Sequence, residues 1–243
     1  MKCYKYLNLK GVTLDKEQLQ NYMEKIAVNY EIDMKSDVET YPINRLMDNY
    51  NFIQITYNTL NEHIKNNIGI YPAGEWLLDN FYIIEETVKN IKNDLTKKKY
   101  KNFPGISTGT YKGFARIYVL ASEIISYTDS KVDEETLTLS LLAYERRKTL
   151  SMEEIWNLPI FLNIAIIENI RVVCEKIMVS QIQKYKVEEI VERLVDKKEN
   201  HKQQYKKIRA NTKMYKNSSF PFIEYMSYKL KRYGKTGNAY LNI

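Results

Sequence analysis

The clearest hydrophobic pattern in the chain lies between residues 73 and 95. Large apolar residues recur there at steps of four and three, and the residues between them are mostly polar. On a helix of about 3.6 residues per turn, this spacing places the apolar side chains on one side. The residues of this pattern are Leu77, Phe81, Ile84, Val88, Ile91 and Leu95. Because Pro72 suits the first turn of a helix, we predict a core helix here that organises the rest of the chain.

The same spacing predicts helices along most of the remaining chain. The predicted segments are 13–30, 44–67, 114–127, 133–149, 151–183 with an extension towards 211, and 220–234. Residues 97–101 form a basic turn, and residues 103–113 form an irregular stretch with three glycines. That stretch lacks the spacing of a P-loop, which argues against a phosphate cradle.

Local signals mark several helix ends. Thr13 and Asp133 are expected N-caps, since their side chains accept hydrogen bonds from the first free amides of a helix. Ser151 and Glu154 have the spacing of a capping box. Pro159 follows within two or three turns, so we expect the long helix to kink or restart there.

The distribution of these patterns determines the predicted fold class. With only 8 glycines and 5 prolines, and no long segment of alternating polarity, nothing requires a sheet. We predict an all-α bundle of about seven helices that includes one long kinked helix. Residues 1–40 are expected to be a loosely attached N-terminal segment with one helix, and residues 41–243 to form a helical domain.

The net charge of +7 is compatible with an anionic partner such as nucleic acid, acidic lipid or a nucleotide sugar. Residues 202–216 are basic and rich in tyrosine, a composition that binds nucleic acid through phosphates and stacking. Arginine is scarce there, which argues against specific readout. The abundance of Lys, Asn, Ile and Tyr also fits an AT-rich coding sequence, which is the reading we favour over nucleic-acid binding.

Few residues are available for metal or nucleophilic chemistry. The chain has two cysteines, Cys3 and Cys174, and two histidines, His63 and His201. These numbers disfavour a disulfide framework, a metal site and a histidine-based catalytic triad, so we predict no metal and no cofactor. Without a signal-peptide pattern or an unbroken apolar run of membrane-spanning length, we expect a soluble, cytoplasmic protein.

Charged residues inside apolar helical patterns are the best candidates for a site. Arg116, Glu168 and Arg171 interrupt predicted packed faces, and Asp79 lies within the organising helix. A buried charge without a partner is costly, so we predict that Arg116 or Arg171 pairs with Asp79 or Glu168 across helices. The alternative is ligand binding. Glu75, Asp79 and Glu86 also fall on related sides of one helix, where a solvated face is favoured over a pair of catalytic acids.

Several stretches together resemble the cyclic β-1,2-glucan synthases. Residues 73–86, AGEWLLDNFYIIEE, resemble that family's AEWLLDNFyvIEE segment. Residues 103–121 resemble its LP.L..G...G.PRvY.lA segment, with Ala115 where proline is usual. Residues 150–171 resemble LTigELWALPtmLRlALiENLRR, with Asn163 in place of arginine, and residues 222–231 are similar to a later, weaker helix.

The resembled family consists of large inner-membrane enzymes that build and cyclise a glucan from UDP-glucose. The resemblance implies the soluble N-terminal region of such an enzyme, without its transferase motifs. It therefore implies a non-catalytic helical module or fragment, at the inner face of the cell membrane, that docks on or regulates the remaining synthase modules. Such a module is expected to expose an apolar patch for its partner.

A free-standing basic helical adaptor for RNA or an acidic membrane surface is the alternative. It predicts binding that weakens steeply as salt rises. Catalysis by this chain alone would require a pocket with paired acids, and the oligomeric state is left open.

Overall fold

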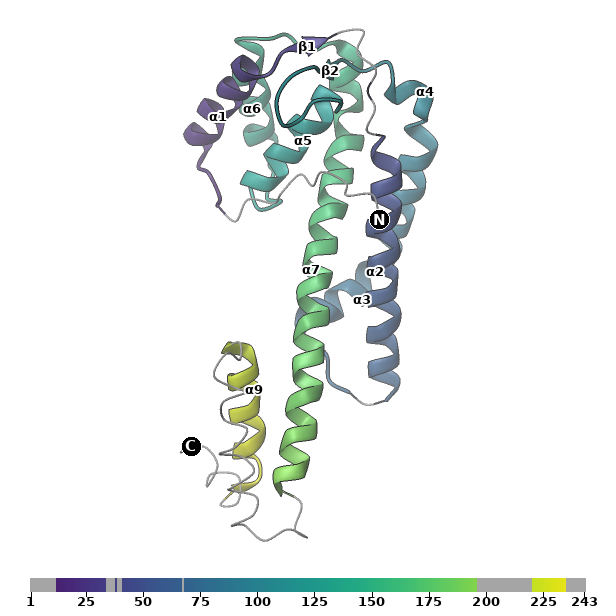
Figure 1. The fold of residues 1–243 in the computed structure, drawn as a ribbon, viewed down its shortest axis with the longest axis vertical. Coiled ribbons are helices and arrows are strands. Elements are labelled where there is room, and N and C mark those ends of the chain that lie inside the picture. Colours follow the sequence, from purple (N-terminus) through teal and green to yellow (C-terminus); the bar gives the residue numbers. More distant parts are fainter. Residues whose placement is uncertain (1–11, 34–37, 39–40, 67, 196–219, 235–243) are drawn as a thin grey trace. The chain divides into compact units, whose positions relative to one another are not determined.

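The computed structural model describes residues 12–33, 38, 41–66, 68–195 and 220–234. These residues form eight helices and one pair of two-residue strands (Figure 1), which confirms the predicted all-α bundle. The helices are α1 (Lys16–Asn29), α2 (Pro42–Lys65), α3 (Pro72–Asp94), α4 (Lys97–Tyr100), α5 (Arg116–Tyr127), α6 (Glu134–Glu145), α7 (Met152–Val195) and α9 (Phe220–Lys231). The strands are β1 (Ile32–Asp33) and β2 (Gly105–Ile106).

Residue contacts divide the chain into two compact units. The first contains the described residues up to Ile68 together with Gly74–Cys174, and the second contains Gly69–Ala73 with the described residues from Glu175 onwards. This division differs from the boundary expected at residue 40. In the second unit, α9 packs Phe222 and Leu230 against Val187 and Val191 of α7.

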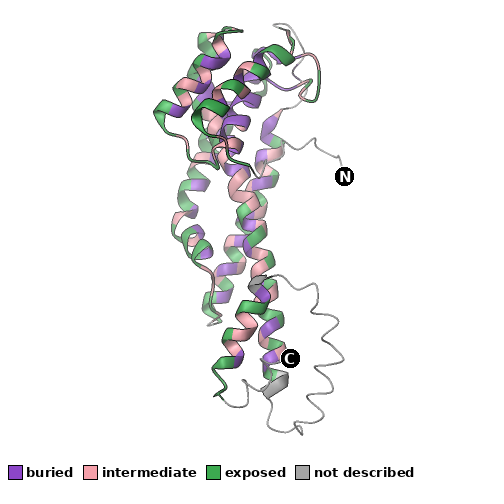
Figure 2. Cartoon of the chain, turned by 90° about the vertical axis from the view of Figure 1, so that its left-hand side faces the viewer, coloured by how far each residue is buried: buried purple, intermediate pink, exposed green. Residues whose placement is uncertain are grey.

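The organising helix α3 is buried along the predicted side. All six residues of the 77–95 pattern are buried, from Leu77 to Leu95 just beyond the end of α3. Phe81 stacks on Tyr57 of α2 with ring centroids 4.1 Å apart. Figure 2 shows buried and exposed residues alternating along the long helices, whereas no residue of α5 is exposed. Burial of each such side chain stabilises the fold by about 1.5–3 kcal/mol, so this stripe is a major part of the core.

The N-terminal helix α1 belongs to the core of the first unit. Leu19, Met23 and Ile26 pack with Leu120 and Ile124 of α5 and with residues of α6. The expectation of a loosely attached segment does not describe this helix, because the apolar side of α1 finds partners a hundred residues later in the chain. The N-cap is also two residues later than predicted.

Asp15 rather than Thr13 caps α1. The Asp15 carboxylate accepts a 2.8 Å hydrogen bond from the Gln18 amide, and the Gln18 side chain accepts from the Asp15 amide at 3.2 Å. The Leu14 amide donates to the Tyr127 carbonyl at 3.0 Å, which holds the preceding backbone outside the helix. This reciprocal pair satisfies two free amides at once, so the helix begins at Lys16.

The start of α7 confirms the predicted capping box. The Ser151 amide and hydroxyl both donate to the Glu154 carboxylate at 2.9 Å, and the Glu154 amide donates to the Ser151 hydroxyl at 3.3 Å. Pro159 lies inside α7, which continues to Val195 without a restart. The predicted extension beyond 195 lies outside the described residues.

The strand pair was not predicted, because two residues are too few to show a periodicity. β1 and β2 pair antiparallel, with Ile32 opposite Ile106. The loop that follows β2 includes Gly109, whose φ of 72° is in the left-handed region. An added Cβ there would lie 2.8 Å from the Tyr30 ring.

Replacing Gly109 with alanine is expected to cost about 1–3 kcal/mol of unfolding free energy, because the backbone conformation and the Tyr30 contact both oppose a side chain. Gly234→Ala is the matched control, since Gly234 also has positive φ but has open space around it. Chemical denaturation followed by circular dichroism measures both. Equal losses for the two variants would contradict a role for the Tyr30 contact.

Candidate functional site

Arg116 and Glu154 form a buried ion pair between α5 and α7. The Arg116 Nε donates to one Glu154 carboxylate oxygen at 2.8 Å, and a terminal nitrogen donates to the other at 2.5 Å. The side chains are 5% and 0% exposed. The sequence predicted a pair between Arg116 or Arg171 and Asp79 or Glu168. Arg116 has a carboxylate partner, as the cost of its burial requires, but the partner is Glu154.

Glu154 also closes the capping box described above, so one carboxylate joins a helix start to a neighbouring helix. Burial works against the charge on Arg116, but hydrogen bonding and proximity to Glu154 outweigh it and leave its pKa raised. A bidentate arginine–carboxylate pair of this kind is rigid and directional. It holds α5 against the start of α7 and is saturated by protein groups, which favours a structural role.

Glu168 and Arg171 lie further along α7, opposite α2. Glu168 pairs with Arg45 of α2, a residue that the sequence analysis did not select. Burial raises the pKa of Glu168, and the nearby Arg45 and Arg171 only partly offset this. The Arg171 guanidinium lies over the Phe52 ring, 5.2 Å from its centroid. Asp79 is on the exposed side of α3. The structure thus brings Glu168 and Arg171 to one seam and leaves Arg116 and Asp79 elsewhere.

A third buried carboxylate, Glu123 of α5, was not predicted from the sequence. It accepts hydrogen bonds from the Tyr22 hydroxyl at 2.6 Å and from the Tyr111 hydroxyl. Burial, followed by the hydrogen bond to Glu123, raises the pKa of both tyrosines. The only sequence signal was an acidic residue within the apolar 114–127 segment. Its contacts tie α1 and the loop before α5 together.

Four exposed residues form an apolar stripe on the first two turns of α7. They are Met152, Ile155, Trp156 and Pro159, here called the α7 stripe, and their spacing of three, one and three places them on one face. Trp156 is 73% exposed and Met152 is 59% exposed. The opposite side of the same turns is buried, including Glu154 and Leu158. This part of α7 is therefore packed on one side and has an apolar side without cover among the described residues.

Part of α7, Met152–Glu192, is long and apolar enough to cross a membrane by length and composition, although it contains no unbroken apolar run of that length. In its most apolar window 44% of the residues are buried within the protein. Core helices of soluble proteins meet the same criteria, so this finding is weak evidence for membrane association. Glu168 falls within the segment and is buried against Arg45.

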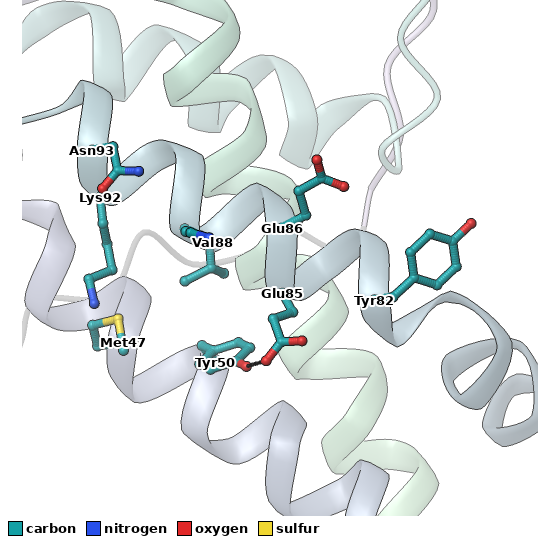
Figure 3. Close-up of a pocket in the computed structure, with 9 residues that line it drawn as sticks. Met47, Tyr50, Tyr82, Glu85, Glu86, Val88, Lys92 and Asn93 are labelled. Atoms are coloured by element: carbon teal, nitrogen blue, oxygen red, sulfur yellow. Dashed lines mark hydrogen bonds between the residues drawn. The ribbon is translucent and has the colours of Figure 1, made fainter.

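A groove lies between α2 and α3 in the first unit (Figure 3). It has a volume of about 590 Å³ and is lined by Met47, Tyr50, Tyr82, Glu85, Glu86, Val88, Lys89, Lys92 and Asn93. The Tyr50 hydroxyl donates to the Glu85 carboxylate at 3.0 Å. Of the three carboxylates expected on related sides of this helix, Glu86 lines the groove, whereas Glu75 and Asp79 do not.

Three further possibilities weighed from the sequence were a metal site, a phosphate cradle and nucleic-acid binding, all of which the sequence disfavoured. The described residues contain no group of three His, Cys, Asp or Glu side chains that could hold a metal ion. The loop after β2 is the stretch that was considered as a phosphate cradle. Its Lys112 and Gly113 amides donate to the carbonyls of Gly109 and Ile106. The basic stretch 202–216, considered for nucleic acid, lies outside the described residues.

Comparison with known proteins gives one informative similarity. No family model matches the chain. Over 152 residues, or 62% of its length, the chain is 29% identical to the cyclic beta-(1,2)-glucan synthase NdvB of Rhizobium meliloti (strain 1021). The aligned part amounts to 5% of that protein. That the similarity lies in the N-terminal region stays a prediction. The comparison thus shows a distant relation between most of this chain and a small part of a cyclic β-1,2-glucan synthase.

Proposed function

We propose that this chain is a non-catalytic helical module in the biosynthesis of a cyclic β-1,2-glucan. In this role it docks on the membrane transferase that uses UDP-glucose, at the inner face of the cell membrane. The observation that carries the proposal is the 29% identity over 152 residues to a cyclic β-1,2-glucan synthase. That synthase is many times longer than the aligned part, so its other segments are the natural docking partners.

The α7 stripe supports a docking role and is the proposed contact surface. An apolar patch on a helix face is typical of a surface that another segment covers. Trp156 is the expected anchor, because large aromatic side chains dominate the binding energy of most interfaces. The ion pair between Arg116 and Glu154 lies behind this surface and keeps the first turns of α7 in place.

Docking is tested with membranes that contain NdvB lacking the segment aligned with this chain. Adding the full chain is expected to restore glucan synthesis from radiolabelled UDP-glucose, and the chain is expected to sediment with the membranes. Trp156→Ser is expected to weaken this binding roughly 30-fold, because an interface anchor contributes about 2 kcal/mol or more. Trp76→Ser on α3 is the matched control, since Trp76 is 53% exposed and does not belong to the α7 stripe.

Two outcomes would overturn the proposal. The docking role would be contradicted if Trp76→Ser and Trp156→Ser weakened membrane binding equally. It would also be contradicted if the unchanged chain did not bind the membranes. Release of glucose from UDP-glucose by the chain alone would show that it is an enzyme. Protein-free vesicles of anionic lipid provide a further comparison: binding to them that falls steeply with salt would favour the adaptor alternative instead.

A further inference from the structure

The groove between α2 and α3 has the composition of a binding site for a neutral, polyhydroxylated ligand. Its volume of about 590 Å³ is within the range of small-molecule sites, roughly 300–1,000 Å³. The lining combines the apolar floor of Met47 and Val88 with carboxylates, ammonium groups and the Asn93 amide. Hydroxyl groups both donate and accept hydrogen bonds, so a ligand rich in hydroxyls satisfies all of these groups.

The charges of the groove argue against a nucleotide sugar. Glu85 and Glu86 offset Lys89 and Lys92, so the lining has no formal excess charge to attract a diphosphate. No ion pair between described residues joins either lysine to these carboxylates. Glu86, Lys89 and Lys92 are therefore available to a ligand, and Glu85 keeps acceptor capacity beside its hydrogen bond from Tyr50. The hydroxyls of a neutral sugar chain can donate to the carboxylates and accept from the ammonium groups. A diphosphate, in contrast, would be repelled by the two carboxylates.

Two tyrosines give the groove a defined geometry. The Tyr50 ring stacks on Phe81 with centroids 6.1 Å apart, and its hydroxyl holds Glu85 at 3.0 Å. Figure 3 shows this pair between α2 and α3, whereas Tyr82 and Glu86 project from α3 away from it. Tyr82 is 65% exposed, so its ring offers an apolar face to a sugar ring beside polar groups that bind hydroxyls.

From these contacts we infer that the α2–α3 groove binds a short linear β-1,2-glucan chain. The choice of this sugar rests on the proposed function, whereas the preference for a neutral polyhydroxylated ligand rests on the groove itself. Glu85 and Glu86 accept hydrogen bonds from sugar hydroxyls, and Lys89, Lys92 and Asn93 donate to hydroxyl oxygens. The groove would thus hold part of the product while the partner extends it.

Isothermal titration of the full chain with a short linear β-1,2-gluco-oligosaccharide tests this inference. We expect saturable binding that UDP-glucose does not compete for. Tyr82→Ala and Glu85→Gln are each expected to weaken binding about tenfold, because each removes one contact with the ligand. Tyr228→Ala is the matched control, since Tyr228 is an exposed tyrosine of α9 that does not line the groove.

The inference is overturned by absence of saturable binding to the folded chain, by competition from UDP-glucose, or by equal effects of Tyr82→Ala and Tyr228→Ala. Both substituted tyrosines are exposed, so unchanged circular dichroism is expected for these variants. The titration uses no membranes, whereas the docking assay depends on the α7 stripe. Failure of docking with intact sugar binding would therefore contradict only the proposed function. Intact docking without sugar binding would contradict only the inference about the groove.

Discussion

Replacing Glu154 with alanine is expected to lower the free energy of unfolding of the first unit by about 3–5 kcal/mol. The change leaves the Arg116 guanidinium buried without the carboxylate that accepts from two of its nitrogens. It also removes the acceptor of the Ser151 amide at the start of α7. An uncompensated buried charge is more costly than the loss of an ordinary hydrogen bond, so this effect should be among the largest of any single substitution.

Urea denaturation followed by circular dichroism measures the loss. Glu153→Ala is the matched control, because Glu153 is an exposed neighbour in the same helical turn and its removal should cost less than about 1 kcal/mol. The double variant Arg116→Met with Glu154→Leu should recover much of the stability, since it removes both charges and retains apolar volume. A loss for Glu154→Ala no greater than that for Glu153→Ala would contradict the structural role of the pair.

Replacing Phe161 with alanine is expected to destabilise the first unit by about 3–5 kcal/mol. Phe161 of α7 is fully buried among the rings of Tyr100, Phe103 and Tyr118, with centroid distances of 6.1, 5.3 and 6.1 Å. These three rings come from two segments, α4 with the turn that follows it and α5, so no single side chain can fill the cavity that the deletion leaves. The loss should therefore be near the upper part of the range for core deletions.

The same denaturation experiment measures this variant against Trp156→Ala. Trp156 is five residues earlier on the same helix but is exposed, so its replacement should change stability by less than about 0.5 kcal/mol. Comparable losses for the two variants would show that the α7 stripe is covered within the chain. That result would also remove the support that the stripe gives to docking.

Several features of the fold followed from local sequence because their physical causes are local. The spacing of residues 77–95 predicted the buried side of α3, since helical periodicity depends only on residues a few positions apart. The capping box of Ser151 and Glu154 was likewise predictable, because both partners lie within one helical turn. Where two caps competed locally, as with Thr13 and Asp15, the sequence pattern chose the wrong one.

The partners of buried charges could not be predicted in the same way. The cost of burying Arg116 required a partner, but any carboxylate brought near in space would meet that requirement. Glu154 already had a local role as a capping residue, so the sequence did not suggest it as the partner of Arg116. Arg45, the partner of Glu168, lies in a helix whose orientation no local pattern reveals. The exposure of Asp79 likewise depends on which neighbours α3 has.

The sequence by itself thus determined seven of the eight described helices, most of their starts and the apolar sides that form the core. The exception is the four-residue α4, which lies where a basic turn was expected. These are set by interactions between residues close together in the chain. Only the tertiary structure decided which side of α7 remained uncovered, which charges met, and that α2 and α3 enclose a groove. Those outcomes depend on how distant segments pack, because burial and pairing are properties of spatial neighbours rather than of sequence neighbours.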